Sequence, residues 1–153
     1  MNLARAVLAF LALPGTVAFA VPLLLVDHPR RFDPSGFILL LPGILGLLAC
    51  VRSFYVEGRG TLAPWSPPRH LVVSGLYHYS RNPMYVSVLL ILAGWAAGFH
   101  SRALAIYAAA VMVAFHLRVV FGEEPWLART HGEAWHRYKA AVPRWFGRAR
   151  GQA

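Results

Sequence analysis

Two short blocks of this sequence hold side chains suited to binding or catalysis. The first runs from Arg69 to Tyr85 (RHLVVSGLYHYSRNPMY) and is polar, aromatic and basic, and the second is the carboxylate pair Glu123 and Glu124. Adjacent carboxylates beside an apolar run are costly unless they are paired or hydrated. The pair therefore either binds a cationic group or orders the arginines of the first block, or it simply faces water at a membrane surface.

The dipeptide Asn82-Pro83 at the end of the first block predicts the start of a helix. Asn is a preferred N-cap residue, and Pro suits the first helical position because its missing N–H would be unpaired there. The helix would enter the apolar stretch after Pro83, and its free N–H groups would face the loop that carries Tyr77, His78 and Arg81. Such a helix start can hold an anion. A plain cap without a ligand is the alternative.

The motifs of several other enzyme classes are missing from the sequence. GxSxG, GxxxxGK[ST], HExxH and GxGxxG do not occur, so a Rossmann nucleotide site is not indicated. The seven histidines show no ligand spacing and Cys50 is the single cysteine, so no metal site is predicted. His116 lies inside an apolar run, where we expect it to form a hydrogen bond within the helical bundle.

The composition indicates a membrane protein of one domain, residues 1–153. Hydrophobic residues make up 58% of the 153 residues, and the mean hydropathy is +0.50. This is too apolar for an ordinary soluble domain and normal for a polytopic membrane protein. The net charge of +9 comes mostly from arginines that flank the apolar runs. It favours anionic lipid head groups over nucleic acid as a partner.

The apolar runs predict an all-α fold, a polytopic membrane helical bundle of about four spans. The expected spans are Ala6–Val26, about Pro34–Val56, Pro83–Phe99 and Ala103–Phe121. Three residues separate the last two spans, so these should form a tight helical hairpin. A signal peptide is the rival interpretation of the first run, because Ala18-Phe19-Ala20 resembles a cleavage site, although no polar break follows it.

Glycine and proline mark the expected breaks between these helices. Those in Glu57–Ser74 exclude a continuous helix there. Gly122 is expected to end the fourth span, and an amphipathic helix of interfacial type should run from Glu123-Glu124-Pro125 to Val142. Gly43 and Gly46 either allow a neighbouring helix to approach the second span closely or only add flexibility to that helix. Residues 1–57 thus hold two spans, and residues 58–144 hold the candidate binding region.

The distribution of basic residues predicts the orientation in the membrane. Most of them lie beside the termini or in the long loop before the third span. By the positive-inside rule both termini face the cytoplasm, and the protein is expected in the cytoplasmic (inner) membrane.

The two blocks and the C-terminal region together resemble a known superfamily. The residues that carry the resemblance are Gly75-Leu76-Tyr77, Arg81-Asn82-Pro83-Met84-Tyr85, Glu123-Glu124, Leu127, Gly132, Tyr138 and Val142-Pro143-Arg144. They resemble the isoprenylcysteine carboxyl methyltransferase and phospholipid methyltransferase superfamily. The resemblance covers about Gly58 to Arg144, and both blocks occur in the family's order around a helical hairpin.

The resemblance implies methyl transfer from S-adenosylmethionine to a lipophilic or membrane-embedded acceptor, either a carboxylate or an amine. The cofactor-binding residues it implies are Arg69, His70, Leu71, Val72, Tyr77, Asn82, Pro83, Met84, Tyr85 and Glu123. An amine acceptor needs a proton acceptor, for which Glu124 and His78 are the candidates. A carboxylate acceptor needs none, because it is already ionised.

The sequence departs from the prenylcysteine enzymes at two positions. The resemblance places an arginine that binds the substrate carboxylate four residues before the cofactor glutamate, but that position is Val119 here. Arg118 is the adjacent candidate, although one residue along an α-helix turns a side chain by about 100°. Asn82 replaces the family's usual histidine. The first departure argues against a prenylcysteine substrate, and neither argues against the cofactor.

Two other functions remain open at this point. A sterol-reductase-like enzyme using NADPH shares an H-P-x-Y element, but the acidic second block and Ser87 favour the methyltransferase. A non-enzymatic membrane adaptor would use the aromatic, arginine-rich loop as an interaction surface. The sequence leaves the acceptor's identity and the oligomeric state open.

Overall fold

The described part of the chain is a bundle of long helices. The structure is a computed structural model that describes residues 11–26, 31–57 and 71–146, and within these ranges it contains no strand. The main helices are a π-helical segment Leu11–Ala20 that continues as α2 (Val21–Leu25), then α3 (Phe37–Val56), α4 (Pro83–Gly98), α5 (Arg102–Arg118) and α6 (Glu124–Ala141). Short 3₁₀ turns lie at Pro34–Gly36 and Gly75–His78, and a π-helical turn, Val119–Glu123, joins α5 to α6.

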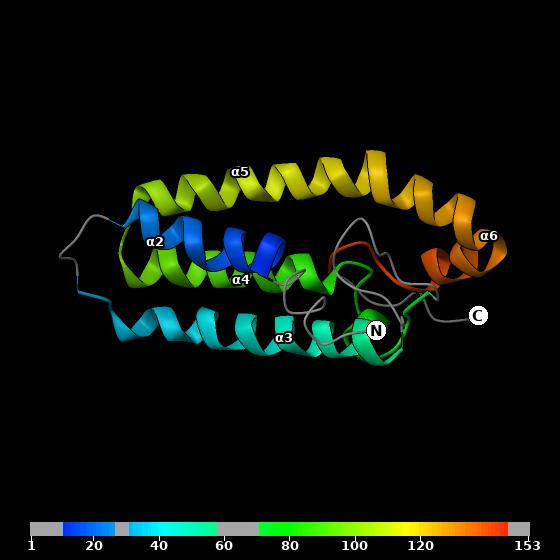
Figure 1. Cartoon of the computed structure of the whole chain (residues 1–153), viewed down its shortest axis with the longest axis horizontal. Coiled ribbons are helices and arrows are strands. Elements are labelled where there is room, and N and C mark those ends of the chain that lie inside the picture. The colour runs from blue at the N-terminus through cyan, green and yellow to red at the C-terminus, as the bar shows by residue number, and fades with distance from the viewer. Residues whose placement is uncertain (1–10, 27–30, 58–70, 147–153) are drawn as a thin grey trace.

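Helix α4 is the centre of the bundle. It packs against both α3 and α5, and these three helices run alongside one another in Figure 1. Where the first helix meets α3 and α4, a core forms from Ala18, Leu47, Val88, Ile91 and Leu92. The side chains of Trp95 and Tyr107 donate hydrogen bonds to backbone oxygens of the first helix, at 3.0 and 3.1 Å. The first helix is thereby tied to both α4 and α5.

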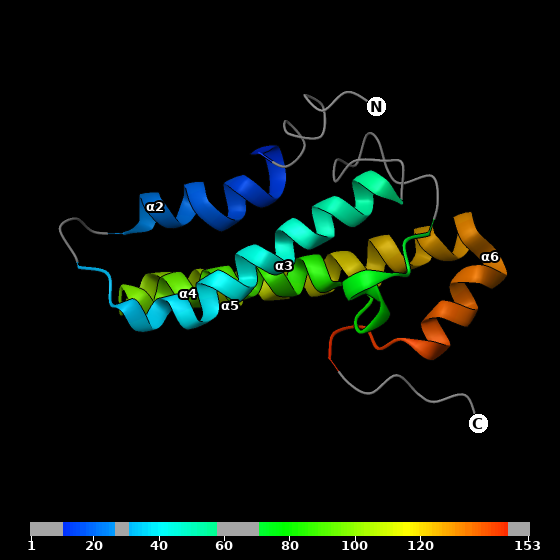
Figure 2. The same ribbon diagram turned by 90° about the horizontal axis from the view of Figure 1, so that it is seen from below.

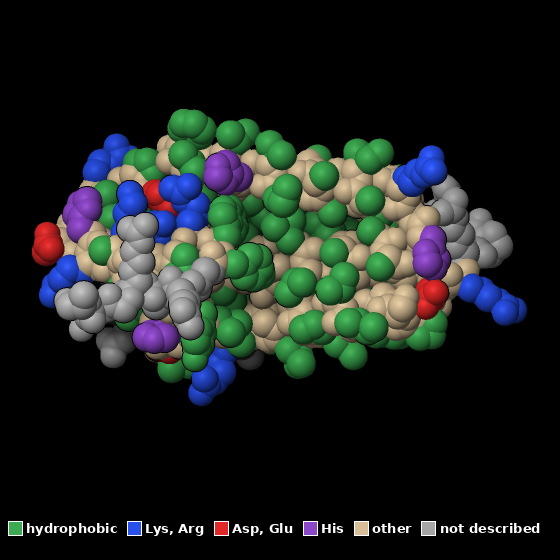
Figure 3. Space-filling model, turned by 180° about the vertical axis from the view of Figure 1, so that it is seen from behind, with side chains coloured by type: hydrophobic (Ala, Val, Ile, Leu, Met, Phe, Trp, Pro, Cys, Tyr) green, Lys and Arg blue, Asp and Glu red, His purple; other side chains and the backbone are tan. Residues whose placement is uncertain are grey.

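The outward sides of the helices are apolar. Large side chains with more than two thirds of their surface exposed include Leu24, Ile38, Leu45, Ile106 and Phe121. Figure 3 shows hydrophobic side chains along the middle of the bundle and charged ones gathered at its two ends. An apolar band between charged ends is the surface that a bilayer requires. The fold is therefore the all-α membrane bundle that the composition predicts.

Two helices are long and apolar enough to cross a membrane. One is Pro34–Val56, which has the limits predicted from the sequence, and the other is the continuous helix Arg102–Ala141, whose apolar part is α5. Pro14–Leu25 and Pro83–Gly98 are apolar but shorter. The prediction of about four spans therefore remains a prediction. Residues 6–10, at the start of the first predicted span, lie outside the described residues.

The hairpin between α4 and α5 has the predicted tight turn. His100 adopts a left-handed backbone conformation with φ of 48°, and the Ser101 side chain accepts a hydrogen bond from the Leu104 N–H, capping α5. At the same end, Asp33 accepts a hydrogen bond from the Ser35 N–H and lies 3.2 Å from the ring of His100. This end of the bundle is distant from both sequence blocks.

The expected helix break at Gly122 is wrong. The chain stays helical from α5 through the π-helical turn into α6, and Gly122 lies inside that turn. A glycine costs a helix only about 1 kcal/mol relative to alanine, so packing of the flanking residues overrides it. The backbone kink is instead at Gly132, with φ of 49°. Figure 2 shows α6 turning away from the axis of α5.

Close backbone contact between α3 and α4 depends on glycines, as predicted for Gly43. A Cβ atom at Gly43 would lie 2.8 Å from the backbone nitrogen of Ile91, and one at Gly94 would lie 2.7 Å from that of Leu40. A methyl group added at either glycine would overlap backbone atoms of the facing helix, so the two helices would have to move apart. Gly46 also lies close to α4, because a Cβ atom there would lie 2.5 Å from the buried Ser87 hydroxyl, which donates a hydrogen bond to the Pro83 oxygen.

Gly94→Ala should therefore destabilise the bundle. Because the added methyl overpacks a backbone contact, we expect a loss of about 1–3 kcal/mol in the free energy of unfolding. Thermal unfolding of the detergent-purified protein measures this as a lowered midpoint. Gly122→Ala is the matched control, since a Cβ there meets nothing within 4 Å. Equal midpoints for the two variants would contradict the close packing.

Candidate functional site

The two sequence blocks meet at one end of the bundle. The loop 71–82, the start of α4, the turn Val119–Glu123 and the segment that follows α6 all converge there. Figure 2 shows the segment after α6 beside the loop before α4. Residues about 40 positions apart in the sequence thus face one another, and the contacts divide into two clusters, one around each glutamate.

The first cluster joins Glu123 to the hairpin. The Tyr85 hydroxyl donates a hydrogen bond to the Glu123 carboxylate. Arg118 Nε donates to the same carboxylate oxygen at 2.8 Å and to the Tyr85 hydroxyl at 3.1 Å. The side chains of Arg118 and Glu123 remain 53% and 32% exposed, so a ligand can reach both charges. The ring of Tyr85 stacks on Phe115 with centroids 4.3 Å apart.

The π-helical turn explains how Arg118 reaches Glu123. In a π-helix the repeat is i to i+5, so residues five apart lie on one face. Arg118 and Glu123 are five apart, and the turn Val119–Glu123 between them is π-helical. The sequence analysis expects the Arg118 side chain to be turned by about 100° from the position that faces Glu123. This expectation assumes an α-helix and is wrong. Arg118 is therefore beside the glutamate despite the extra residue.

The second cluster is a buried ion triad of Arg81, Glu124 and Arg144. Arg81 Nη1 donates to Glu124 at 2.8 Å. Arg144 binds the same carboxylate through two nitrogens, at 2.7 and 2.9 Å. The side chains of Arg81 and Glu124 are only 8% and 9% exposed. The guanidinium of Arg81 also lies over the ring of Trp135, 5.4 Å from its centroid.

The triad keeps all three of its groups charged. Burial alone would raise the pKa of Glu124, but the hydrogen bond from Arg144 and the charges of both arginines lower it below its ordinary value. Hydrogen bonding to Glu124 raises the pKa of Arg144, whereas burial lowers that of Arg81. Both arginines remain cationic at neutral pH. A carboxylate held by two cations is poorly suited to accept a proton.

Backbone hydrogen bonds fasten the C-terminal segment onto the start of α4. The Arg81 N–H donates to the Pro143 oxygen at 2.9 Å. The side chains of Ser80 and Asn82 donate to the Arg144 oxygen at 3.3 and 3.0 Å. Asn82 does occupy the N-cap position of α4, but its side chain does not cap the helix. The expected capping contact is wrong, because the amide of Asn82 is used for the Arg144 oxygen.

Several residues of the first block pack rather than face the exposed charges. Tyr77 is buried against Cys50, Val72, Phe54 and Met84, and burial raises its pKa well above the ordinary value. The Tyr138 hydroxyl donates to the Tyr77 backbone oxygen at 2.7 Å. Leu71 packs on the cluster formed by Trp135, Tyr138 and Val142. Pro83 is buried at the start of α4. Arg69 and His70 lie outside the described residues.

His78 lies on the surface of the loop. Its ring is exposed and meets the ring of Tyr79 edge-on, with centroids 5.5 Å apart. Among the described residues it makes no hydrogen bond to Glu123 or Glu124. No group of three or more potential metal ligands occurs in residues 11–26, 31–57 and 71–146.

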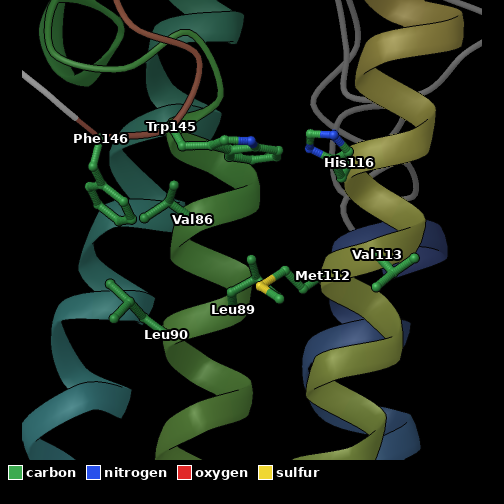
Figure 4. Close-up of a pocket in the computed structure, with 8 residues that line it drawn as sticks. All are labelled: Val86, Leu89, Leu90, Met112, Val113, His116, Trp145 and Phe146. Carbon is green, nitrogen blue, oxygen red and sulfur yellow. The ribbon is translucent and has the colours of Figure 1, made fainter.

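An apolar groove of about 540 Å³ opens between α4 and α5 beside the first cluster. Its lining residues are Val86, Leu89, Leu90, Met112, Val113, His116, Trp145 and Phe146. Figure 4 shows His116 and Trp145 facing each other across its end. Their rings stack with centroids 6.2 Å apart. His116 is exposed toward this groove, so its expected place within the bundle is wrong.

Sequence reasoning missed the parts of this site that depend on the C-terminal segment. In the sequence, Arg144 belongs to a Val-Pro-Arg motif, and this motif does not predict its pairing with Glu124. Trp145 follows directly after it and carries no motif. The signal that could have found this pair is an arginine close to the C-terminus, since a buried glutamate needs cationic partners.

Comparison with known proteins identifies a family for most of the chain. The family model described as phospholipid methyltransferase matches residues 36–134, which is well over half of the sequence. The matched region includes α3, the α4–α5 hairpin, the π-helical turn and the start of α6. Searches of curated proteins and of solved structures gave no match.

Glu124→Ala should lower the free energy of unfolding, because Glu124 is a buried partner of two arginines. Removing the shared acceptor leaves two cations facing each other beside Trp135, and breaking a buried ion pair costs about 3–5 kcal/mol. Because Arg144 is one third exposed, we expect the lower end of that range. A lowered thermal midpoint measures it. Glu133→Ala, an exposed position on the same helix, should leave the midpoint unchanged. A shift no larger than that of the control would contradict the triad's structural role.

Proposed function

The chain belongs to the phospholipid methyltransferase family, and from that premise we propose that it transfers a methyl group from S-adenosylmethionine to a lipophilic acceptor at this end of the bundle. The observation that carries the proposal is the contact of Glu123 with Tyr85 and Arg118. It brings the two blocks of the family resemblance to one accessible place. When bound, S-adenosylmethionine supplies a methyl group on a positively charged sulfur.

The first cluster suits the amino-acid end of S-adenosylmethionine, which carries an ammonium and a carboxylate group. Arg118 and Glu123 offer one charge of each sign to bind them. Only Nε of Arg118 is used in the contacts with Glu123 and Tyr85. Its terminal nitrogens can therefore hold a carboxylate in bidentate fashion. Glu123 can accept hydrogen bonds from an ammonium or a hydroxyl group.

The start of α4 offers a second place for negative charge. Its first-turn N–H groups have no intrahelical partner, and the Asn82 side chain does not cover them. A helix start of this kind favours an anion. Met84 and Tyr85 belong to that first turn, so we assign both to the cofactor site together with Asn82 and Pro83.

We assign the other predicted site residues to two different roles. Leu71, Val72 and Tyr77 support the site from behind, since their side chains pack into the clusters beneath it. Arg69 and His70 remain proposed cofactor contacts. Glu124 is a positioning residue, because its carboxylate holds Arg81 and Arg144. Methyl transfer needs the acceptor, methyl carbon and sulfur in line with water excluded, and such positioning contributes up to about 7–11 kcal/mol.

Calorimetric titration with S-adenosylhomocysteine tests the cofactor site. Glu123→Gln keeps the shape but removes the charge, and a hydrogen bond to a charged group contributes about 1.5–3 kcal/mol. We therefore expect a dissociation constant about 10- to 100-fold higher than that of the wild type. Glu133→Gln, exposed on α6, is the matched control. Binding of NADPH but not of S-adenosylhomocysteine would point to the reductase alternative, and binding of neither would point to the adaptor.

We further propose that this end of the bundle faces the cytoplasm. The basic residues Arg81, Arg118 and Arg144 lie here, together with Arg129, Arg137 and Lys139 on α6, which matches the positive-inside rule. A cytoplasm-dependent reporter fused after Ala153 should be active, whereas a periplasm-dependent one should be silent. The reverse pattern would contradict the orientation while leaving the cofactor site untouched.

A further inference from the structure

Residues 133–146 form a strap that folds back toward the start of α4. Helix α6 kinks at Gly132, where φ is 49° and ψ is −124°. A Cβ atom there would meet no described atom within 4 Å, so glycine is needed at this position for its backbone conformation and not for space. Figure 2 shows the chain after the kink turning back toward the loop that precedes α4. The direction of the strap therefore depends on one residue.

The strap is fastened to the loop before α4 at several separate points. The Tyr138 hydroxyl donates a hydrogen bond to the Tyr77 oxygen at 2.7 Å. The Pro143 oxygen accepts a hydrogen bond from the Arg81 N–H at 2.9 Å, and the Arg81 guanidinium lies over the ring of Trp135. Loss of any one of these contacts loosens the strap without removing the others.

The side chain of Asn82 has two alternative partners, the strap and its own helix. Its amide group donates a hydrogen bond to the Arg144 oxygen of the strap at 3.0 Å. Asn82 also occupies the N-cap position of α4, where asparagine normally accepts a hydrogen bond from the N–H of the second or third helical residue. With the strap in place the Asn82 side chain makes no such capping bond. In this structure the side chain therefore holds the strap and leaves the helix uncapped.

The uncapped N–H groups are the ones that the proposed function uses. The second and third residues of α4 are Met84 and Tyr85, and their N–H groups have no partner within the helix. An anionic group of the cofactor and the side-chain oxygen of Asn82 would compete for them. Closure of the strap keeps Asn82 away from these groups, and a bound anion keeps Asn82 available to the strap.

We propose that Asn82 is a two-position switch that couples closure of the strap to binding of the cofactor. When the strap is open, Asn82 caps α4; when it is closed, Asn82 holds the Arg144 oxygen and the helix start is free for the cofactor. Gly132 is the hinge, and the pair of Arg144 with Glu124 keeps the strap closed. The proposal rests on the cofactor site inferred above and adds its regulation. Because linkage is reciprocal, closure and binding favour each other by the same factor.

Distances between two spin labels test the movement of the strap without any turnover. The labels are attached at Ala140→Cys on the strap and Tyr55→Cys at the end of α3, which are both exposed, whereas Cys50 is buried and protected from labelling. Tyr138→Phe removes the hydrogen bond to the Tyr77 oxygen. In double electron–electron resonance this variant should show a larger share of a second, open distance, and S-adenosylhomocysteine should restore the closed one.

Tyr107→Phe is the matched control for Tyr138→Phe. It removes a similar hydrogen bond, from the Tyr107 hydroxyl to the Val17 oxygen at 3.1 Å, which joins α5 to the first helix and not to the strap. The label distances should stay those of the wild type. An equal change in both variants, or no change in Tyr138→Phe, would overturn the movement of the strap.

Gly132→Ala tests the hinge with the same labels. Alanine rarely adopts a φ of 49°, so the kink should straighten and the open distance should predominate. Gly122→Ala lies in the helical turn before α6 and should keep the closed distance. A closed distance that persists in Gly132→Ala would overturn the hinge.

Two substitutions of Asn82 test the switch by calorimetric titration with S-adenosylhomocysteine. Serine caps a helix about as well as asparagine, but its shorter side chain does not reach the Arg144 oxygen, and alanine does neither. Both variants should open the strap. Asn82→Ser should bind about fivefold more weakly than Asn82→Ala, because the serine cap competes with the anion for the same N–H groups. If Asn82 only contacted the cofactor, alanine would be at least as weak as serine, and that result would overturn the switch.

The outcomes separate this inference from the proposed function. Failure of the wild type to bind S-adenosylhomocysteine would remove the cofactor site and the coupling to it. The label distances in Asn82→Ser would then still decide whether Asn82 holds the strap, since a strap that opens supports this role and one that stays closed overturns it. A wild type that binds S-adenosylhomocysteine while the open share in Tyr138→Phe is unaffected by the ligand keeps the proposed function and overturns the coupling.

Discussion

The wide helical turn at Val119–Glu123 is the feature on which the rest of the site depends. A π-helical turn takes in one more residue than an α-helical one, so Glu123 lies over Arg118 and reaches Tyr85. Glu124 then points to the other side, toward Arg81 and Arg144. One local change in helical pitch therefore directs two adjacent carboxylates into two different ion clusters. π-helical turns inside longer helices are often found at functional sites.

The two carboxylates differ in what surrounds them, and this divides their functions. Glu123 is about one third exposed, and its partner Arg118 is about half exposed, so a ligand can reach both side chains. Glu124 is buried and holds the C-terminal segment against the start of α4. The same segment carries Trp145, which forms the end of the apolar groove. In the proposed function, Glu123 therefore meets the cofactor directly, whereas Glu124 acts only through the segment that it holds.

Local patterns in the sequence predicted the helices but not how their ends interlock. The apolar runs predicted Pro34–Val56, the hairpin and the helix start at Pro83, because burial in lipid and proline geometry act locally. The pitch of the turn before Glu123 was not predictable, since the same residues fit an α-helix or a π-helix. The partner of Asn82 lies 62 residues away, and the ring that stacks on His116 belongs to the segment after α6. Contacts of this range leave no periodic signal.

Hydrogen exchange measured by mass spectrometry is the most direct test of the central claim that both blocks form one cofactor site. The account predicts that S-adenosylhomocysteine slows amide exchange in peptides spanning residues 77–86 and 118–127 together, with the same dependence on its concentration. Peptides from the opposite end, around His100, should not change. Protection of one block alone, or protection of the two blocks at clearly different concentrations, would contradict a shared site.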